Sequence, residues 1–208
     1  GKKPLVLFCS IETDAEHIDA FELGLKRDWS PRLQTNISLF YYDYQDAQVP
    51  VTYQPAVGPQ QSIIFNIPKS RSLGIELESI WAPLDALQIL FNYAYLDATV
   101  REACCIVDAA DPLALAPGAT PANATGGQNL KGNRLPLSPR NKISLNANYT
   151  WDFGAGSLVA SASYLWRDEV YSLIFDRDYY QADARDQVDL RVTWRDADDR
   201  YSIIAYGQ

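Results

Sequence analysis

Two glutamates, Glu76 and Glu78, are the carboxylates best spaced for chemistry in this sequence. They lie two residues apart in an alternating run, so both side chains lie on the same face of a strand. Two carboxylates on one face could serve a glycoside hydrolase, with one acting as acid and the other as base or nucleophile. The interpretation that we favour is structural: a network with Lys69, Arg71 or a domain that the sheet encloses.

The remaining candidates for chemistry are weaker. His17 is the only histidine, so a serine or cysteine nucleophile has one possible imidazole partner, and we interpret it as a polar residue at a strand start. Residues Asp196–Asp199 are acidic like a calcium loop but lack its glycine and distal glutamate, which favours a solvated turn. We therefore predict no enzyme activity, no metal site and no cofactor.

The three cysteines, Cys9, Cys104 and Cys105, have neither metal-site spacing nor the count of a disulfide framework. A bridge from Cys9 to either member of the adjacent pair stays open at this level.

The elements that position these residues are alternating strands. Between Leu73 and Leu96, two runs with one apolar face each are joined by a short turn, which predicts a β-hairpin. Prolines at positions 50, 55 and 59 exclude residues 46–61 from a central strand. Eight strands are expected, at residues 16–26, 33–44, 62–81, 87–96, 142–151, 157–166, 188–194 and from 201 onward.

Composition limits where such a sheet could lie. Apolar residues make up 47% of the chain, yet the mean hydropathy is −0.21, as expected when apolar and polar residues alternate. The net charge of −8 argues against a nucleic-acid partner, which needs a basic surface. No apolar run approaches the roughly 18 residues of a transmembrane helix, so a membrane-spanning form must be a barrel.

The order of turns and the placement of tryptophans favour that barrel. Short turns follow the first, third, fifth and seventh strands, whereas long connections follow the second, fourth and sixth, the latter two at residues 97–136 and 167–186. Trp29, Trp81, Trp151 and Trp194 all lie at short turns with apolar parity, as in an aromatic girdle. The predicted fold is all-β: an antiparallel up-and-down transmembrane β-barrel whose apolar face contacts lipid.

Five segments carry a family resemblance: AFELGLKRDW at 20–29, LFYYDYQDAQV at 39–49, SRSLGIELESIW at 70–81, FNYAYLDA at 91–98 and GNRLPLSPRNKISLNANYTW at 132–151. In this order they resemble the C-terminal β-barrel of a TonB-dependent outer-membrane receptor. The resemblance implies that residues 1–208 are a partial barrel domain, about eight of roughly twenty-two strands, without the plug domain and the last strand.

The resemblance also implies a function. Such receptors import siderophore-iron, vitamin B12 or oligosaccharides across the outer membrane of Gram-negative bacteria, using energy supplied by TonB through an N-terminal part that is absent here. A monomeric barrel in the lipid bilayer is expected. The alternatives are a passive porin, an outer-membrane enzyme, which the single histidine disfavours, and a soluble β-sandwich, which would not place tryptophans at alternate turns.

Candidate ligand-binding residues are arginines and tyrosines of the expected outer loops, which offer charge-assisted hydrogen bonds and stacking. They are Arg101, Arg134, Arg167, Tyr171, Arg177, Tyr179 and Tyr180. The charged residues expected to face the lumen are Glu76, Glu78, Lys142 and Arg191.

Overall fold

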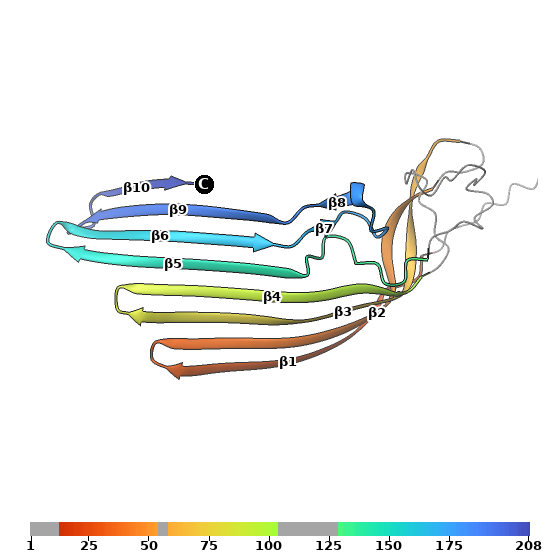
Figure 1. Ribbon diagram of the computed structural model, residues 1–208, viewed down its shortest axis with the longest axis horizontal. Coiled ribbons are helices and arrows are strands. Elements are labelled where there is room, and N and C mark those ends of the chain that lie inside the picture. Colours follow the sequence, from red (N-terminus) through yellow and green to blue (C-terminus); the bar gives the residue numbers. More distant parts are fainter. Residues whose placement is uncertain (1–12, 54–57, 104–128) are drawn as a thin grey trace, which may run out of the picture.

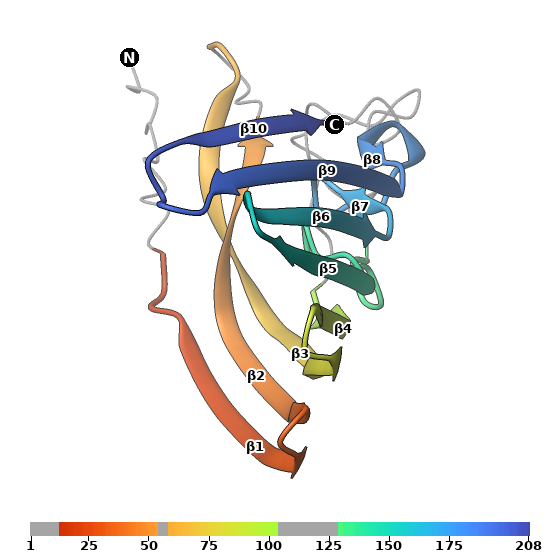
Figure 2. The ribbon, with the colours of Figure 1, turned by 90° about the vertical axis from the view of Figure 1, so that its left-hand side faces the viewer.

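The computed structural model describes residues 13–53, 58–103 and 129–208. Eight long strands form one antiparallel sheet in the order β1-β2-β3-β4-β5-β6-β9-β10, which confirms the predicted all-β class. The sheet is curved and open, with β1 and β10 at its edges (Figures 1 and 2). The strands are β1 His17–Ser30, β2 Leu33–Tyr53, β3 Gln61–Leu84, β4 Leu87–Glu102, β5 Asn141–Phe153, β6 Gly156–Arg167, β9 Arg185–Asp196 and β10 Ser202–Gly207.

The connections alternate as expected. Short turns join β1 to β2, β3 to β4, β5 to β6 and β9 to β10 at one end of the sheet, on the left in Figure 1. Neighbouring hairpins are staggered along the strand direction. The first residue of β2, Leu33, lies opposite Trp81, but β3 continues to Leu84. The first residue of β4, Leu87, lies opposite Tyr149, but β5 continues to Phe153. Such a stagger tilts the strands against the axis of a barrel.

The predicted connection at residues 46–61 was wrong for residues 46–53, which belong to β2, and for Gln61, which begins β3. The β2–β3 ladder continues as far as the Tyr53–Gln61 pair, and Figure 1 shows this two-stranded arm bending away from the sheet. Pro50 is tolerated opposite Ile64 because β1 stops pairing with β2 at Gln45, so that among the described residues the β2 edge of the arm has no strand partner.

The fourth strand is also longer than the predicted 87–96, and it extends to Glu102. The segment before β5 continues the sheet beside it: the Val100 N–H donates to the Asn133 carbonyl at 2.8 Å, and the Leu135 N–H donates to the Ala98 carbonyl at 3.0 Å. Both ends of the predicted insertion at 97–136 are therefore structured.

The connection after β6 contains a small ladder. Strand β7 (Val170–Tyr171) pairs with β8 (Gln181–Ala182), and the 3-10 helix η2 (Asp178–Tyr180) lies between them. No helix among the described residues is long and apolar enough to cross a membrane.

The buried apolar core lies at the end of the sheet that carries the long connections, opposite the short turns, and not on the faces of the long strands. It gathers side chains from the β2–β3 arm, the end of β4, the segment before β5 and the connection after β7. Its members are Val51, Ile67, Val100, Ala103, Leu130, Ile174 and Phe175. On the strands, by contrast, Phe21 is 66% exposed and Leu23 is 71% exposed. A continuous stripe of exposed apolar residues marks a surface that contacts lipid or another protein.

Candidate functional site

The polar face of the sheet has a hollow of about 370 Å³ at its centre. Glu76 lies opposite Ala94 of β4, and Ala94 lies opposite Lys142 of β5, so the small alanine separates a carboxylate from an ammonium group. Glu78 also lines the hollow, and its Oε2 accepts a hydrogen bond of 3.2 Å from Asn36. The structure thus brings three of the four expected lumen-facing charges together. The fourth, Arg191, lies on β9 and donates from Nε to Thr193 Oγ1 at 3.3 Å.

The expected network of the two glutamates with Lys69 and Arg71 was wrong. Lys69 pairs with Glu102, with 3.6 Å between Nζ and Oε2, and Arg71 pairs with Asp97. The physical reason is parity: positions 69 and 71 are odd on β3, whereas the glutamates are even and lie on the other face.

A hydrogen-bonded ladder on β5 and β6 was missed by the sequence reasoning. Asn146 donates to Ser163 Oγ at 2.7 Å, Asn148 donates to Asn146 Oδ1 at 2.6 Å, and Ser161 donates to Asn148 Oδ1 at 2.7 Å. The signal was available, since both asparagines and both serines share polar parity on strands expected to be neighbours. This part of the polar face satisfies its own hydrogen bonds.

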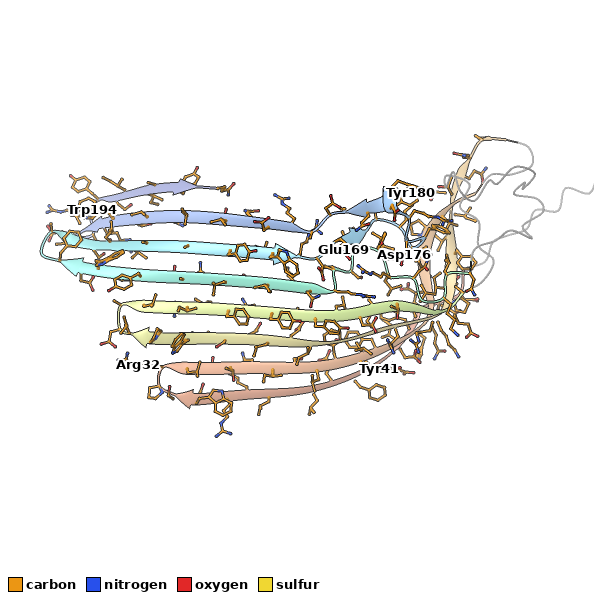
Figure 3. All side chains as sticks on the ribbon, in the orientation of Figure 1. Arg32, Tyr41, Glu169, Asp176, Tyr180 and Trp194 are labelled. Carbon is orange, nitrogen blue, oxygen red and sulfur yellow. The ribbon has the colours of Figure 1, made fainter. Side chains whose placement is uncertain are left out.

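Arg134, in the segment before β5, contacts three residues of the connection after β6. Its Nη1 donates to Glu169 Oε1 at 2.8 Å, its backbone N–H donates to Asp176 Oδ2 at 2.9 Å, and its guanidinium lies 5.6 Å from the centre of the Tyr171 ring. The hydrogen bond from Arg134 lowers the pKa of Glu169, whereas burial raises the pKa of Asp176. Figure 3 shows Glu169 and Asp176 in these loops.

The other predicted ligand residues are more scattered. Arg101 is exposed at a register shift in the β3–β4 ladder. Arg167 is the last residue of β6, and its side chain donates a hydrogen bond of 2.9 Å to the Asp168 carbonyl. The rings of Tyr179 and Tyr180 meet edge to face at 4.7 Å in η2, directly after Arg177. Their role in ligand binding stays a prediction.

The weaker candidates for chemistry show no assembled site in the described residues. His17 lies 3.5 Å from Asp19 at the exposed start of β1. Asp196 and Asp199 close a turn through a hydrogen bond of 3.1 Å from the Asp199 N–H to the Asp196 carbonyl. No group of three or more metal-binding side chains occurs within the described ranges. Cys9, Cys104 and Cys105 lie outside them.

A family model described as "TonB dependent receptor-like, beta-barrel" matches residues 11–207. The chain belongs to the TonB-dependent receptor β-barrel family. No curated protein matches its sequence significantly. The family assignment confirms the resemblance noted in the sequence.

Solved receptor structures share the fold of this TonB-dependent receptor chain. The ferric yersiniabactin uptake receptor FyuA from Yersinia pestis is 17% identical, with a TM-score of 0.67 over 92% of this chain and 24% of that one. BauA, the ferric preacinetobactin receptor from Acinetobacter baumannii, is 16% identical, with a TM-score of 0.59 over 88% and 23%. The copper transporter OprC is 13% identical, with a TM-score of 0.58 over 88% and 24%. The chain thus spans about a quarter of each structure's length.

As a receptor barrel, the sheet carries aromatic side chains near both ends of its apolar face. Trp151 and Trp194 flank Leu158 in one cross-strand row near the short turns, and Figure 3 shows Trp194 at that end. A second set near the loop end was missed: Tyr41 is opposite Leu73, and Trp166 is opposite Ile143. Two aromatic belts on one face are typical of the two membrane interfaces.

Proposed function

We propose that this chain forms part of the wall of an outer-membrane receptor that imports a ferric siderophore with energy from TonB. The observation that carries the proposal is the family match over residues 11–207. Receptors for ferric siderophores among the structural relatives support iron as the cargo. Vitamin B12 and oligosaccharides are the alternative cargoes.

The proposal includes further strands beside this chain. In hydrocarbon every backbone N–H and C=O group needs a partner, so an open sheet edge is not stable there. β1 and β10 are the open edges of the eight-stranded sheet. We infer that they pair with other strands of a monomeric receptor, of which residues 1–208 are a partial barrel domain, and that the barrel encloses a plug that contacts TonB.

The proposed location is the outer membrane of a Gram-negative bacterium, and the proposed role includes no catalytic step. The apolar stripe of β1, with Leu23 71% exposed, supports contact with lipid. A passive porin would have the same stripe and the same aromatic belts, so the plug and the requirement for energy are what separate the two functions.

The test is uptake of radioactive iron, supplied as ferric siderophores, by cells that lack the gene for the complete receptor. We expect uptake of at least one complex to be lost, restored by the gene, and lost again when TonB is deleted. Uptake that persists without TonB would favour the porin, and unchanged uptake of every ferric complex would refute iron as the cargo.

A further inference from the structure

Three cations lie side by side on the polar face of the wall, at the end that carries the long loops. Lys142 of β5 pairs in register with Arg167 of β6, and Arg167 pairs with Arg185 of β9. Lys142 lines the polar-face hollow, and strand alternation places the other two on the same face. We call these three residues the cation row. Arg185 was not among the residues singled out from the sequence.

The cation row is unfavourable for the sheet by itself, because like charges at directly opposed positions repel each other. The ion pairs among the described residues all use other cations. Arg167 donates to a backbone carbonyl, and the side chains of Lys142 and Arg185 are exposed. In a chain with a net charge of −8, none of the three cations forms an ion pair with a carboxylate of the described residues.

The hollow beside the cation row has space for an anion, and the charges around it favour binding at the cation row. The hollow of about 370 Å³ adjoins Lys142, since Ala94 fills little of the space between Lys142 and Glu76. Glu76 and Glu78 line the same hollow and repel an anion from the β3 side. An anionic group that enters is therefore drawn towards β6 and β9, where Arg167 and Arg185 lie.

We propose that the cation row binds an anionic group of the imported ligand, a carboxylate or another oxyanion, as the ligand enters the lumen. The inference rests on the proposed function, whose import route passes this face. Two guanidinium groups and an ammonium group offer several charge-assisted hydrogen bonds, which are stronger than neutral ones. The cation row selects ligands by their charge, whereas the long loops select them by their shape.

The experiment uses the complete receptor in detergent, with ferric citrate as the anionic probe and an uncharged ferric hydroxamate complex as the neutral probe. Calorimetric titration measures binding to the wild type, to the triple variant K142Q/R167Q/R185Q and to the control R191Q, which removes a cation on the same face further along β9. We expect ferric citrate to bind the triple variant about tenfold more weakly or worse, and R191Q to bind like wild type. The affinity of the wild type should fall with added salt.

A second variant separates charge from folding. The variant K142R/R167K/R185K keeps all three charges and should retain salt-dependent binding within about threefold, about 0.7 kcal/mol. Absence of ferric citrate binding by the wild type would overturn the proposal, because a site that selects for negative charge should bind this anion. Equal binding by the triple variant, or loss of binding in the charge-conserving variant, would overturn it too.

Uptake distinguishes this inference from the function on which it rests. Anion binding that depends on the cation row, without TonB-dependent uptake, would support the site and refute the proposed function. TonB-dependent uptake together with unaltered anion binding by the triple variant would support the function and refute the site.

Discussion

Arg134 donates from Nη1 to Glu169 Oε1 at 2.8 Å, and this pair ties the segment before β5 to the connection after β6. Both side chains are largely covered, with 17% and 28% of their areas exposed. The same cluster holds Asp176, and next to it Ile174 and Phe175 belong to the buried core. The segment before β5 and the connection after β6 are thus packed against each other and joined by charged side chains.

Glu169→Gln should loosen this cluster at neutral pH. The pKa of Glu169 is lowered by Arg134, so the stabilisation is complete above the ordinary glutamate pKa and is lost as pH falls through the lowered value. We expect a loss of about 1–2 kcal/mol of local stability at pH 7. Hydrogen exchange of residues 129–137 in the complete receptor measures it, and the difference from wild type should fade in acid. A variant that exchanges like wild type at pH 7 would contradict the assignment.

Asp176→Asn should have the opposite effect. Burial raises the pKa of Asp176, and its Oδ1 is buried without a hydrogen-bond partner among the described residues. Because a raised pKa means that the charged form is disfavoured in the fold, protonation stabilises the loops and the benefit is lost as pH rises. Asparagine removes the charge and can still accept from the Arg134 N–H. We expect slower exchange of residues 129–137 at pH 7, with no difference in acid. Faster exchange at pH 7 would show that the carboxylate charge is needed.

Gly74→Ala should impair assembly of the wall. A Cβ at this position would overlap the Tyr95 carbonyl oxygen and lie 2.6 Å from the Phe40 ring, so the backbone must shift. Such overpacking costs about 1–3 kcal/mol. The fraction of complete receptor with heat-dependent gel mobility measures folding. Gly24→Ala is the matched control, since its Cβ would meet only ordinary contact at 3.8 Å. Equal folding of both variants would contradict this account.

Leu145→Arg and Ser144→Arg test which face contacts lipid. Leu145 lies between Phe91 and Tyr164 on the apolar face, and Ser144 lines the polar-face hollow. An arginine facing lipid near the bilayer centre costs about 2–4 kcal/mol. We expect the Leu145 variant of the complete receptor to fold less stably into vesicles, in a urea titration, by about that amount. The stability of the Ser144 variant should remain close to that of the wild type. A larger loss of stability in the Ser144 variant than in the Leu145 variant would show that the polar face, and not the apolar face, contacts lipid.

The local pattern of residues was enough to predict the eight strands of the main sheet, the apolar and polar faces of those strands and the tryptophans near the short turns. Side chains alternate with period two within one strand, so no distant contact is needed to recognise which residues share a face. For the same reason, the sequence placed Glu76, Glu78 and Lys142 on the polar face, and the hollow that they line agrees with it. Lys69 and Arg71 were assigned to the glutamate network by proximity in sequence, although the same parity rule separates them.

Tertiary structure decided everything that depends on pairing between strands. Pro50 fits a strand because β1 pairs with β2 only as far as Gln45, so that no described strand pairs with β2 at Pro50 on that side, which the prolines by themselves do not reveal. The loop core joins Val51, Leu130 and Phe175 across long stretches of chain. The cation row exists because the registers of β5, β6 and β9 bring Lys142, Arg167 and Arg185 to the same level. Register is set by turns and by packing between strands, so a one-residue slip would have placed other residues together.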